Sequence, residues 1–242
     1  MPVYLLSEQI AFPPPDLARS DGILAVGGDL SVERLILAYR MGIFPWYGEG
    51  DPIIWWSPDP RLVLYPSALR VSRRLARTVR RNRFEITFDR AFDAVIDACA
   101  RVPRKRDDGT WIVPDMIRAY NRLHRAGYAH SVEAWRDGEL VGGLYGVSLG
   151  GSFFGESMFT HARDASKVAF VRLVSRLDDW GFDLVDCQVR TDHLIRFGAE
   201  EIPRKRFLAE LRRSVDRPTR AGPWTDASDS SNAFHIDSRP GR

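Results

Sequence analysis

The sequence predicts a mixed α+β fold, in which a small N-terminal domain precedes a larger mixed-sheet domain. Residues 1–60, the predicted N-terminal domain, are rich in proline, glycine and tryptophan and contain a single short helical pattern. Residues 131–159 contain consecutive strand patterns separated by glycine-bearing turns. An amphipathic helical pattern over 164–180 then leads into an apolar strand pattern over 182–189. Helices combined with a strand meander in this way indicate the α+β class.

The predicted N-terminal domain is built mostly from loops. Its one helix is predicted over 30–39, because Ser31 is a suitable N-cap and Gly42 lies where a helix should end. Loop segments over 44–47 and 55–61 carry bulky aromatic side chains. Such side chains gain stability by burying their large apolar area, so we expect this part of the chain to pack against something larger than itself.

The larger domain is predicted over residues 61–216, and its pattern resembles the core of the acetyltransferase-like (GNAT-type) N-acyltransferase fold. Residues 217–242 are rich in proline, serine, aspartate and glycine without periodicity, so we expect a disordered tail. The predicted helices are 71–83, 92–100, 115–127, 164–180 and 203–215, and the predicted strands are 84–88, 131–135, 139–149, 152–159 and 182–189.

The composition favours a cytoplasmic globular protein. Hydrophobic residues make up 44% of the 242 residues, which is enough for a true core. The sequence has no apolar run near the roughly 18 residues that a membrane span requires, and its start lacks the pattern of a signal peptide. Cys99 and Cys187 are the only cysteines and form no close pair in the sequence. A disulfide framework is therefore not expected, and a reducing cytoplasm is the natural setting.

The basic residues are almost all arginine. The net charge is +3, and subtracting the three lysines from 35 Lys+Arg leaves 32 arginines. Arginine suits phosphate recognition because its fork donates two parallel hydrogen bonds. A codon bias that favours arginine is the alternative explanation, so the position of the arginines matters more than their number.

Several long sequence motifs are typical of one protein family. They are 27–31 (GGDLS), 42–47 (GIFPWY), 55–61 (WWSPDPR), 110–112 (TWI), 129–133 (AHSVE), 140–147 (LVGGLYGV), 154–159 (FGESMF), 165–167 (ASK) and 186–188 (DCQ). In this order and spacing the chain resembles the leucyl/phenylalanyl-tRNA–protein transferases. The resemblance extends from about residue 10 to about residue 211, which is nearly all of the chain before the predicted tail.

This resemblance implies an aminoacyltransferase that needs no cofactor. The implied reaction takes leucine or phenylalanine, less readily methionine, from its tRNA and joins it to a protein whose N-terminal residue is arginine or lysine. Such a tag marks the acceptor protein for degradation. The implied partners are the charged tRNA and the acceptor protein, with no membrane, and we expect a monomer. No metal, nucleotide or coenzyme takes part, and the five histidines show no metal-ligand spacing.

Asp186 and Gln188 are the first candidates for catalysis. The donor ester is already activated, so the reaction needs a neutral, well-aimed amine and stabilisation of the oxyanion. The two residues lie two apart in the predicted strand, so their side chains should share one face. Asp186 would accept or orient the amine proton, and Gln188 would hold the ester carbonyl or the amine; the resemblance points to the same pair. Alternatively, Asp186 is a buried structural carboxylate, or only positions the amine while the 2′-hydroxyl of the adenosine moves the proton.

Glu156 is the third catalytic candidate, in the strand-end word 155–158. A carboxylate there would attract the cationic side chain of the acceptor or pair with its amine. A plain salt bridge, for example to Lys167, is the alternative.

The donor must be selected by its side chain, because every tRNA ends in the same CCA. We predict an apolar pocket walled by Leu144, Met158, Phe170 and Leu173, although residues of these types more often form ordinary core. Shape would exclude β-branched side chains with ratios of about 10- to 200-fold per misfit. The resemblance raises Met158 above the others.

Three aromatic residues are candidates to stack on the terminal adenosine. They are Trp46, Trp111 and Tyr120. Base stacking on an aromatic side chain is worth about 1–3 kcal/mol and does not depend on sequence. Ordinary packing is the alternative, and the resemblance favours Trp46 and Trp111.

A basic helical pattern over 71–83 is the candidate tRNA-binding element. Val71, Leu75 and Val79 share one side, and the arginines occupy others without any acidic residue. A merely solvated face would mix charges of both signs, so we favour a phosphate-binding stripe. The stripe comprises Arg73, Arg74, Arg77, Arg80, Arg81 and Arg83.

Two other functions remain open. A coenzyme A-dependent acetyltransferase of the same fold would need a glycine-rich pyrophosphate turn, but the turn over 159–167 contains no glycine and carries Asp164. A non-catalytic tRNA-binding module would need the arginine stripe but not Asp186 and Gln188.

Overall fold

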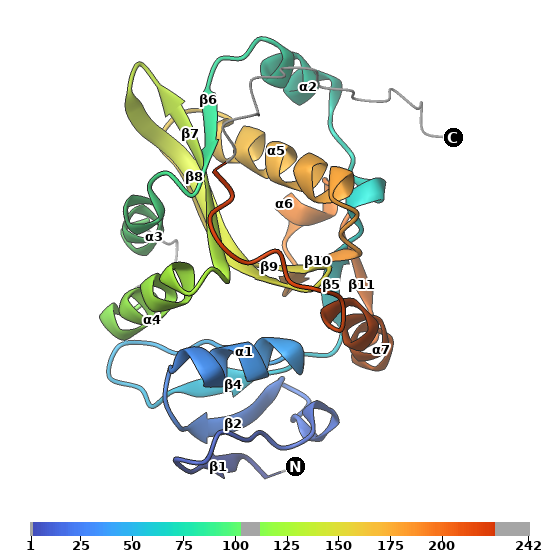
Figure 1. The fold of residues 1–242 in the computed structure, drawn as a ribbon. Helices are drawn as coiled ribbons and strands as arrows, with labels where there is room; N and C mark the ends of the chain where they lie inside the picture. Colours follow the sequence, from blue (N-terminus) through green and yellow to red (C-terminus); the bar gives the residue numbers. More distant parts are fainter. Residues whose placement is uncertain (1, 103–111, 226–242) are drawn as a thin grey trace.

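The fold has two sheets, which follow one another along the chain. A computed structural model describes residues 2–102 and 112–225. A four-stranded sheet has the strand order β1-β2-β4-β3, and a seven-stranded sheet has the order β11-β5-β10-β9-β8-β7-β6. Figure 1 shows the small sheet in blue below the large one, with helix α1 between them. The predicted α+β class with a small N-terminal domain is confirmed; its boundary at residue 60 stays a prediction.

The N-terminal part contains strands where the sequence predicted loops. Strands β1 (Tyr4–Leu6), β2 (Ile23–Gly27), β3 (Phe44–Pro45) and β4 (Ile54–Trp56) surround the short helix η1 (Pro15–Leu17) and α1 (Val32–Arg40). Most of these strands are too short for an alternating pattern to show. The predicted helix is confirmed: the Ser31 side chain accepts a hydrogen bond from the backbone N–H of Arg34, and Gly42 follows the helix with φ 72°.

The aromatic N-terminal segments pack against the larger sheet, as expected. Leu24 and Trp55 from the small sheet belong to the same apolar core as Tyr145, Phe154 and Phe207 from the large part. Trp55 is fully buried. The small sheet therefore shares a core with the rest of the chain.

The large sheet contains the predicted meander. Strands β7, β8 and β9 pair antiparallel in sequence order, and β10 returns parallel to β9 after helix α5. β5 and β11 were not predicted as strands; the latter is a three-residue edge strand that begins with two glutamates. The strands are β5 (Arg61–Leu64), β6 (Glu85–Phe88), β7 (Ala129–Arg136), β8 (Glu139–Leu149), β9 (Ser152–Thr160), β10 (Leu184–Gln188) and β11 (Glu200–Ile202).

Helices cover both faces of this sheet. α2 and α5 belong to one apolar cluster, whereas α1, α3, α4 and α7 belong to the other. Because successive side chains of a strand point to opposite faces, β8 and β9 contribute to both clusters. Leu144 and Phe153 face α5, and Tyr145 and Phe154 face α3 and α1. The helices are η2 (Pro66–Ala68), α2 (Arg73–Arg80), α3 (Phe92–Ala100), α4 (Pro114–Arg125), α5 (Ala165–Asp179), α6 (Asp192–Ile195) and α7 (Arg204–Val215). No helix in the described ranges is long and apolar enough to span a membrane.

The segment after α7 is packed against the protein. Trp224 is 2% exposed, and its ring stacks on His130 at 3.8 Å between centroids. Its backbone N–H donates to Asp89 Oδ2 at 2.7 Å. The prediction of a disordered tail is therefore wrong for 217–225, because one large aromatic side chain anchors an otherwise polar segment. Residues 226–242 lie outside the described residues.

Replacing Trp224 by alanine should lower the free energy of unfolding by about 3–5 kcal/mol, the usual loss when a large buried side chain is truncated. Urea unfolding of the full chain measures this change. Trp224→Phe keeps a ring over His130 and should lose clearly less. Equal stability of the alanine variant and the parent would show that the segment adds nothing to the fold.

Candidate active site

An apolar cavity opens between β3, strands β8 to β10 and helices α5 and α6. Its volume is about 360 Å³. All the predicted wall residues line it: Leu144, Met158, Phe170 and Leu173. The walls also carry Glu156 and Gln188, so the cavity combines an apolar body with a polar side. This is the usual composition of a small-molecule site.

The end of β10 is irregular, and the irregularity decides which side chains face the cavity. Val185 and Cys187 line it, as alternation along the strand requires, whereas Asp186 is fully buried and is not among the lining residues. The strand pairing with β5 shifts between Asp186 and Gln188, and Gln188 has φ 63°. This bulge turns the Gln188 side chain toward the cavity. The prediction that Asp186 and Gln188 share a face is therefore wrong, because the strand is not regular at that point.

Asp186 forms a buried ion pair instead of facing the cavity. Arg61 donates from Nε to Asp186 Oδ1 at 2.8 Å and from Nη2 to Oδ2 at 2.6 Å. The backbone N–H of Gln188 also donates to Asp186 Oδ1, at 2.9 Å. This geometry favours the alternative in which Asp186 is a structural, hydrogen-bonded carboxylate.

Glu156 is the centre of a polar network in the cavity wall. Its Oε1 accepts hydrogen bonds from Tyr39 and from Gln188 Nε2, both at 2.8 Å, and its Oε2 accepts from Tyr120 at 3.0 Å. The two tyrosine hydroxyls also contact each other. Lys167 pairs with Asp164 at 3.3 Å, so the predicted alternative of a Glu156–Lys167 salt bridge is wrong.

Burial favours the neutral form of Glu156. Removal from water raises the pKa of this carboxyl to about 7, hydrogen bonds from Tyr39, Tyr120 and Gln188 oppose the rise, and the charge of Asp186 adds to it. The Glu156 carboxyl and the two tyrosine hydroxyls make three oxygen–oxygen contacts with one another. When Glu156 is ionised, only the two hydroxyl protons are available for these three contacts. A proton on Glu156 supplies the third hydrogen bond. Glu156 therefore titrates close to neutral pH.

The three predicted adenosine-stacking residues lie in different places. Trp46 is 39% exposed, lines the cavity and packs against Trp56 with ring centroids 5.4 Å apart. Tyr120 is fully buried and bonded to Glu156, so the prediction that it stacks on a base is wrong. Its helix turns it into the core instead of toward solvent. Trp111 lies outside the described residues.

Two arginines of α2, Arg74 and Arg77, line a second, basic groove of about 720 Å³. Leu75 and Val79 are buried, which leaves the arginine side chains exposed. Arg73 and Arg80 do not line the groove, and Arg74 is paired with Asp164 at 2.7 Å. The groove arginines are Arg74, Arg77, Arg81, Arg83, Arg136 and Arg163. Arg136 and Arg163 were not predicted because they lie far from α2 in the sequence, at the end of β7 and just before α5.

The word at 27–31 has a structural role. Gly27 and Gly28 have φ of 88° and 72°, and a Cβ on Gly28 would lie 3.1 Å from the Arg34 guanidinium carbon. The Asp29 carboxylate accepts a hydrogen bond from Arg34 Nε at 3.2 Å and another from the backbone N–H of Ser31 at 2.7 Å.

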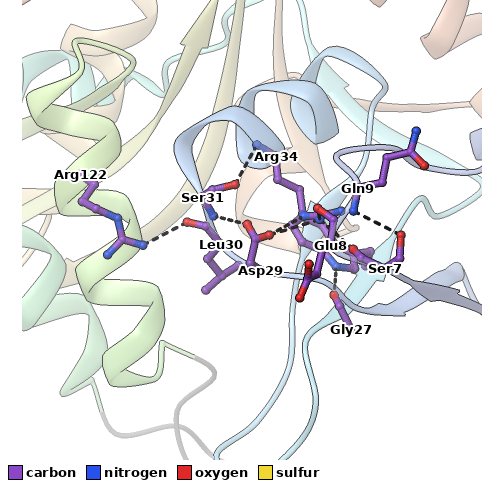
Figure 2. Close-up of polar contacts among 10 residues, drawn as sticks. Ser7, Glu8, Gln9, Gly27, Asp29, Leu30, Ser31, Arg34 and Arg122 are labelled. Atoms are coloured by element: carbon purple, nitrogen blue, oxygen red, sulfur yellow. Dashed lines mark hydrogen bonds and ion pairs between the residues drawn. The ribbon is translucent and has the colours of Figure 1, made fainter.

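The 27–31 segment also connects α1 to α4. Figure 2 shows Arg122 of α4 reaching the carbonyl of Leu30, to which it donates at 3.1 Å. Since α1 carries Tyr39 and α4 carries Tyr120, this contact holds together the two helices that supply the tyrosines to Glu156.

Comparisons with known proteins show which family the chain belongs to. Residues 63–212 match the family described as leucyl/phenylalanyl-tRNA protein transferase, and residues 28–59 match the N-terminal domain of the same family. The chain belongs to this family. It is 64% identical to a leucyl/phenylalanyl-tRNA–protein transferase of Anaeromyxobacter sp. (strain Fw109-5) over 95% of this chain and 98% of that one. It is 59% identical to a leucyl/phenylalanyl-tRNA–protein transferase of Myxococcus xanthus over 94% of this chain and 98% of that one.

The transferase is therefore an enzyme, an aminoacyltransferase, as the sequence predicted. Among solved structures it aligns with L-PGS from Bacillus licheniformis, with 13% identity and a TM-score of 0.38, over 70% of this chain and 54% of that one. A TM-score this low does not assign a fold, so the acetyltransferase-like description stays a prediction.

Proposed function

We propose that the transferase moves leucine or phenylalanine, less readily methionine, from its tRNA to the α-amine of proteins that begin with arginine or lysine. The product marks those proteins for degradation in the cytoplasm, and the enzyme acts as a monomer without a coenzyme. The observation that carries this proposal is the apolar cavity whose polar side holds Glu156 and Gln188. The meander, α5 and the parallel return strand β10 support the acetyltransferase-like description.

The reaction exchanges an ester for an amide. The amine nitrogen bonds to the ester carbonyl carbon, the bond from that carbon to the ribose oxygen breaks, and the ribose oxygen takes up the proton that the amine nitrogen loses. The Gln188 amide nitrogen is held by Glu156. Its carbonyl oxygen therefore remains to accept a hydrogen bond from the attacking amine and to aim it.

Glu156 assists in its ionised form. It would attract the cationic acceptor, whose α-amine has an ordinary pKa of about 8. An amine that binds as the cation must lose a proton before it attacks, and a carboxyl with a pKa of about 7 is matched to that transfer near neutral pH. Asp186 serves by holding the strand end, since Arg61 occupies both of its oxygens.

The cavity selects the donor. Leu144, Met158 and Phe170 provide apolar walls that accept the flexible Leu, Phe and Met side chains. Trp46 at its edge is placed to stack on the terminal adenosine, and we assign the same role to Trp111 from the family resemblance.

The basic groove binds the phosphates of the tRNA. Groove arginines from α2 and from the residues directly after it form one wall, joined by Arg136 and Arg163. Replacing Arg77 and Arg81 by alanine should weaken tRNA binding and lower the slope of log affinity against log salt by about one per lost phosphate contact. Filter binding over a salt series measures the slope. Arg73→Ala with Arg80→Ala, on the same helix but outside the groove, should change it less; equal changes would place the tRNA elsewhere.

The site does not suit coenzyme A. Helix α5 begins directly after Asp164, whose φ is 69° and whose carboxylate is held at the helix N-terminus by Arg74 and Lys167. A pyrophosphate placed there would meet this negative charge.

The test is a transfer assay. The purified chain should transfer labelled leucine from charged tRNA to a peptide beginning with arginine or lysine, and not to one beginning with aspartate. An absence of transfer together with tight binding of acetyl-CoA would reject the proposal in favour of an acetyltransferase.

A further inference from the structure

Arg61 is a buried cation at the start of β5, directly after the chain leaves the small sheet. It is 1% exposed. Its guanidinium lies between the rings of Phe44 and Phe207, 4.8 and 4.7 Å from their centroids. Arginine is seldom fully buried unless it is paired, so this position needs a specific explanation.

Arg61 and Asp186 form a bidentate ion pair. Nε and Nη2 each donate to a different carboxylate oxygen, which fixes the plane of the Asp186 side chain. The remaining nitrogen, Nη1, is buried and has no hydrogen-bond partner among the described residues. A pair retained only for stability is commonly replaceable by apolar residues. The bidentate geometry fixes where the Asp186 oxygens lie, so the role of this pair depends on what those oxygens contact.

Asp186 acts on Gln188. Its Oδ1 accepts from Arg61 and also from the backbone N–H of Gln188 at 2.9 Å. Gln188 has the left-handed φ of 63° at the point where the pairing with β5 shifts. A non-glycine residue needs support to stay in this region. With that support, the Gln188 side chain points into the cavity and donates to Glu156.

Phe44 connects this arrangement to the N-terminal sheet. It belongs to β3, lines the cavity and covers one face of the Arg61 guanidinium. The chain of contacts therefore runs from the small sheet through Arg61 and Asp186 to the amide of Gln188.

We propose that Arg61 is a positioning residue, which acts through Asp186 to hold Gln188 in its bulged, cavity-facing conformation. This inference rests on the proposed role of Gln188 in transfer. The N-terminal sheet then contributes to the geometry of the reaction and not only to the core.

The decisive variant removes both charges, because Arg61→Met alone leaves a buried, unpaired Asp186 and is expected to impair folding. Arg61→Met with Asp186→Asn should fold. The new amide side chain no longer has a fixed plane, so we expect kcat to fall about 10- to 100-fold, as for a small displacement of a reacting group, with KM for the charged tRNA unchanged. Arg61→Lys, which keeps the charge but not the fork, should show the same division between kcat and KM.

A matched control lies at the other end of the same strand. Arg217 pairs with Asp183, which immediately precedes β10, at 2.9 Å. Arg217→Met with Asp183→Asn also removes an Arg–Asp pair and should leave kcat unchanged. A folded Arg61/Asp186 double variant with the kcat of the parent would overturn the inference and return the pair to a structural role.

A second readout does not depend on transfer. The Gln188 side-chain amide, held by Glu156, should give a distinct NMR signal that is slow to exchange with solvent in the parent and fast in the Arg61/Asp186 double variant. If the parent transfers no amino acid, the proposed function fails while this signal still tests the positioning. An unchanged signal in the double variant would overturn the inference even if the parent is active.

Discussion

Glu156→Gln should reduce amino-acid transfer by about 100- to 1,000-fold, the usual range for losing a proton-transferring or charge-stabilising group. The amide keeps the size of the side chain and can still bond to Tyr39, Tyr120 and Gln188. It cannot carry a charge or accept the amine proton. Binding of charged tRNA should remain, because the groove arginines lie on another element. Labelled-leucine transfer and filter binding measure the two effects separately.

The same substitution should stabilise the folded protein above neutral pH. The pKa of Glu156 is raised from 4.5 to about 7 in the folded state. The parent therefore loses folding stability as the pH rises from the unfolded pKa through about 7, whereas glutamine does not titrate. The variant gains up to about 3 kcal/mol relative to the parent above pH 7 and nothing below pH 4.5.

Urea unfolding at pH 4.5 and at pH 8.5 tests this sign. Glu139→Gln serves as the control, because Glu139 is exposed at the start of β8 and lies outside the network. It should not change how stability depends on pH. If Glu156→Gln and the parent lose stability equally between the two pH values, folding does not raise the pKa of Glu156, and the proposed match between this carboxyl and the amine proton is wrong.

The sequence predicted the cavity walls because they follow regular periodicity. Phe170 and Leu173 lie three apart on α5 and so share a face, and Leu144 pairs directly with Met158 across β8 and β9. Periodicity is reliable wherever the element itself is regular. It also placed the buried side of α2 and hence the exposed arginines.

The polar part of the site could not be predicted in the same way. Two-residue spacing assigned Asp186 and Gln188 to one face, but a bulge at Gln188 separates them. Tyr39 and Tyr120 meet Glu156 from 117 and 36 residues away along the chain. Only the packing of α1 and α4 against the sheet brings them together. The sequence motifs indicated that these positions belong to the family pattern, but they did not predict which of the side chains contact one another.

The geometry of the candidate site depends on both parts of the chain. Tyr39 reaches Glu156 from the N-terminal part, and Phe44 lines the cavity from the same part. A truncated large sheet would keep Gln188 and Glu156 in sequence but lose contacts that hold them. The shared apolar core has the same consequence, since removing the small sheet would expose part of it to water.

Met158→Trp should change the choice of donor more than any other substitution in the cavity. Met158 is a partly exposed wall residue opposite Leu144, so a larger ring can enter the cavity without displacing the buried core. An indole there takes up space that a phenylalanyl side chain needs, and leucyl requires less of it. We expect phenylalanine transfer to fall about 100-fold and leucine transfer about 10-fold, within the range that shape misfit produces in apolar pockets.

Competition between leucyl- and phenylalanyl-tRNA in one transfer reaction measures this ratio directly. Met158→Leu conserves the volume of the side chain and should keep the parental ratio. Because we assign the tRNA body to the groove arginines, we expect the affinity of Met158→Trp for uncharged tRNA not to change. A parental Phe-to-Leu ratio in the folded tryptophan variant would mean that the donor side chain binds elsewhere, and the cavity would then have to be assigned to the acceptor.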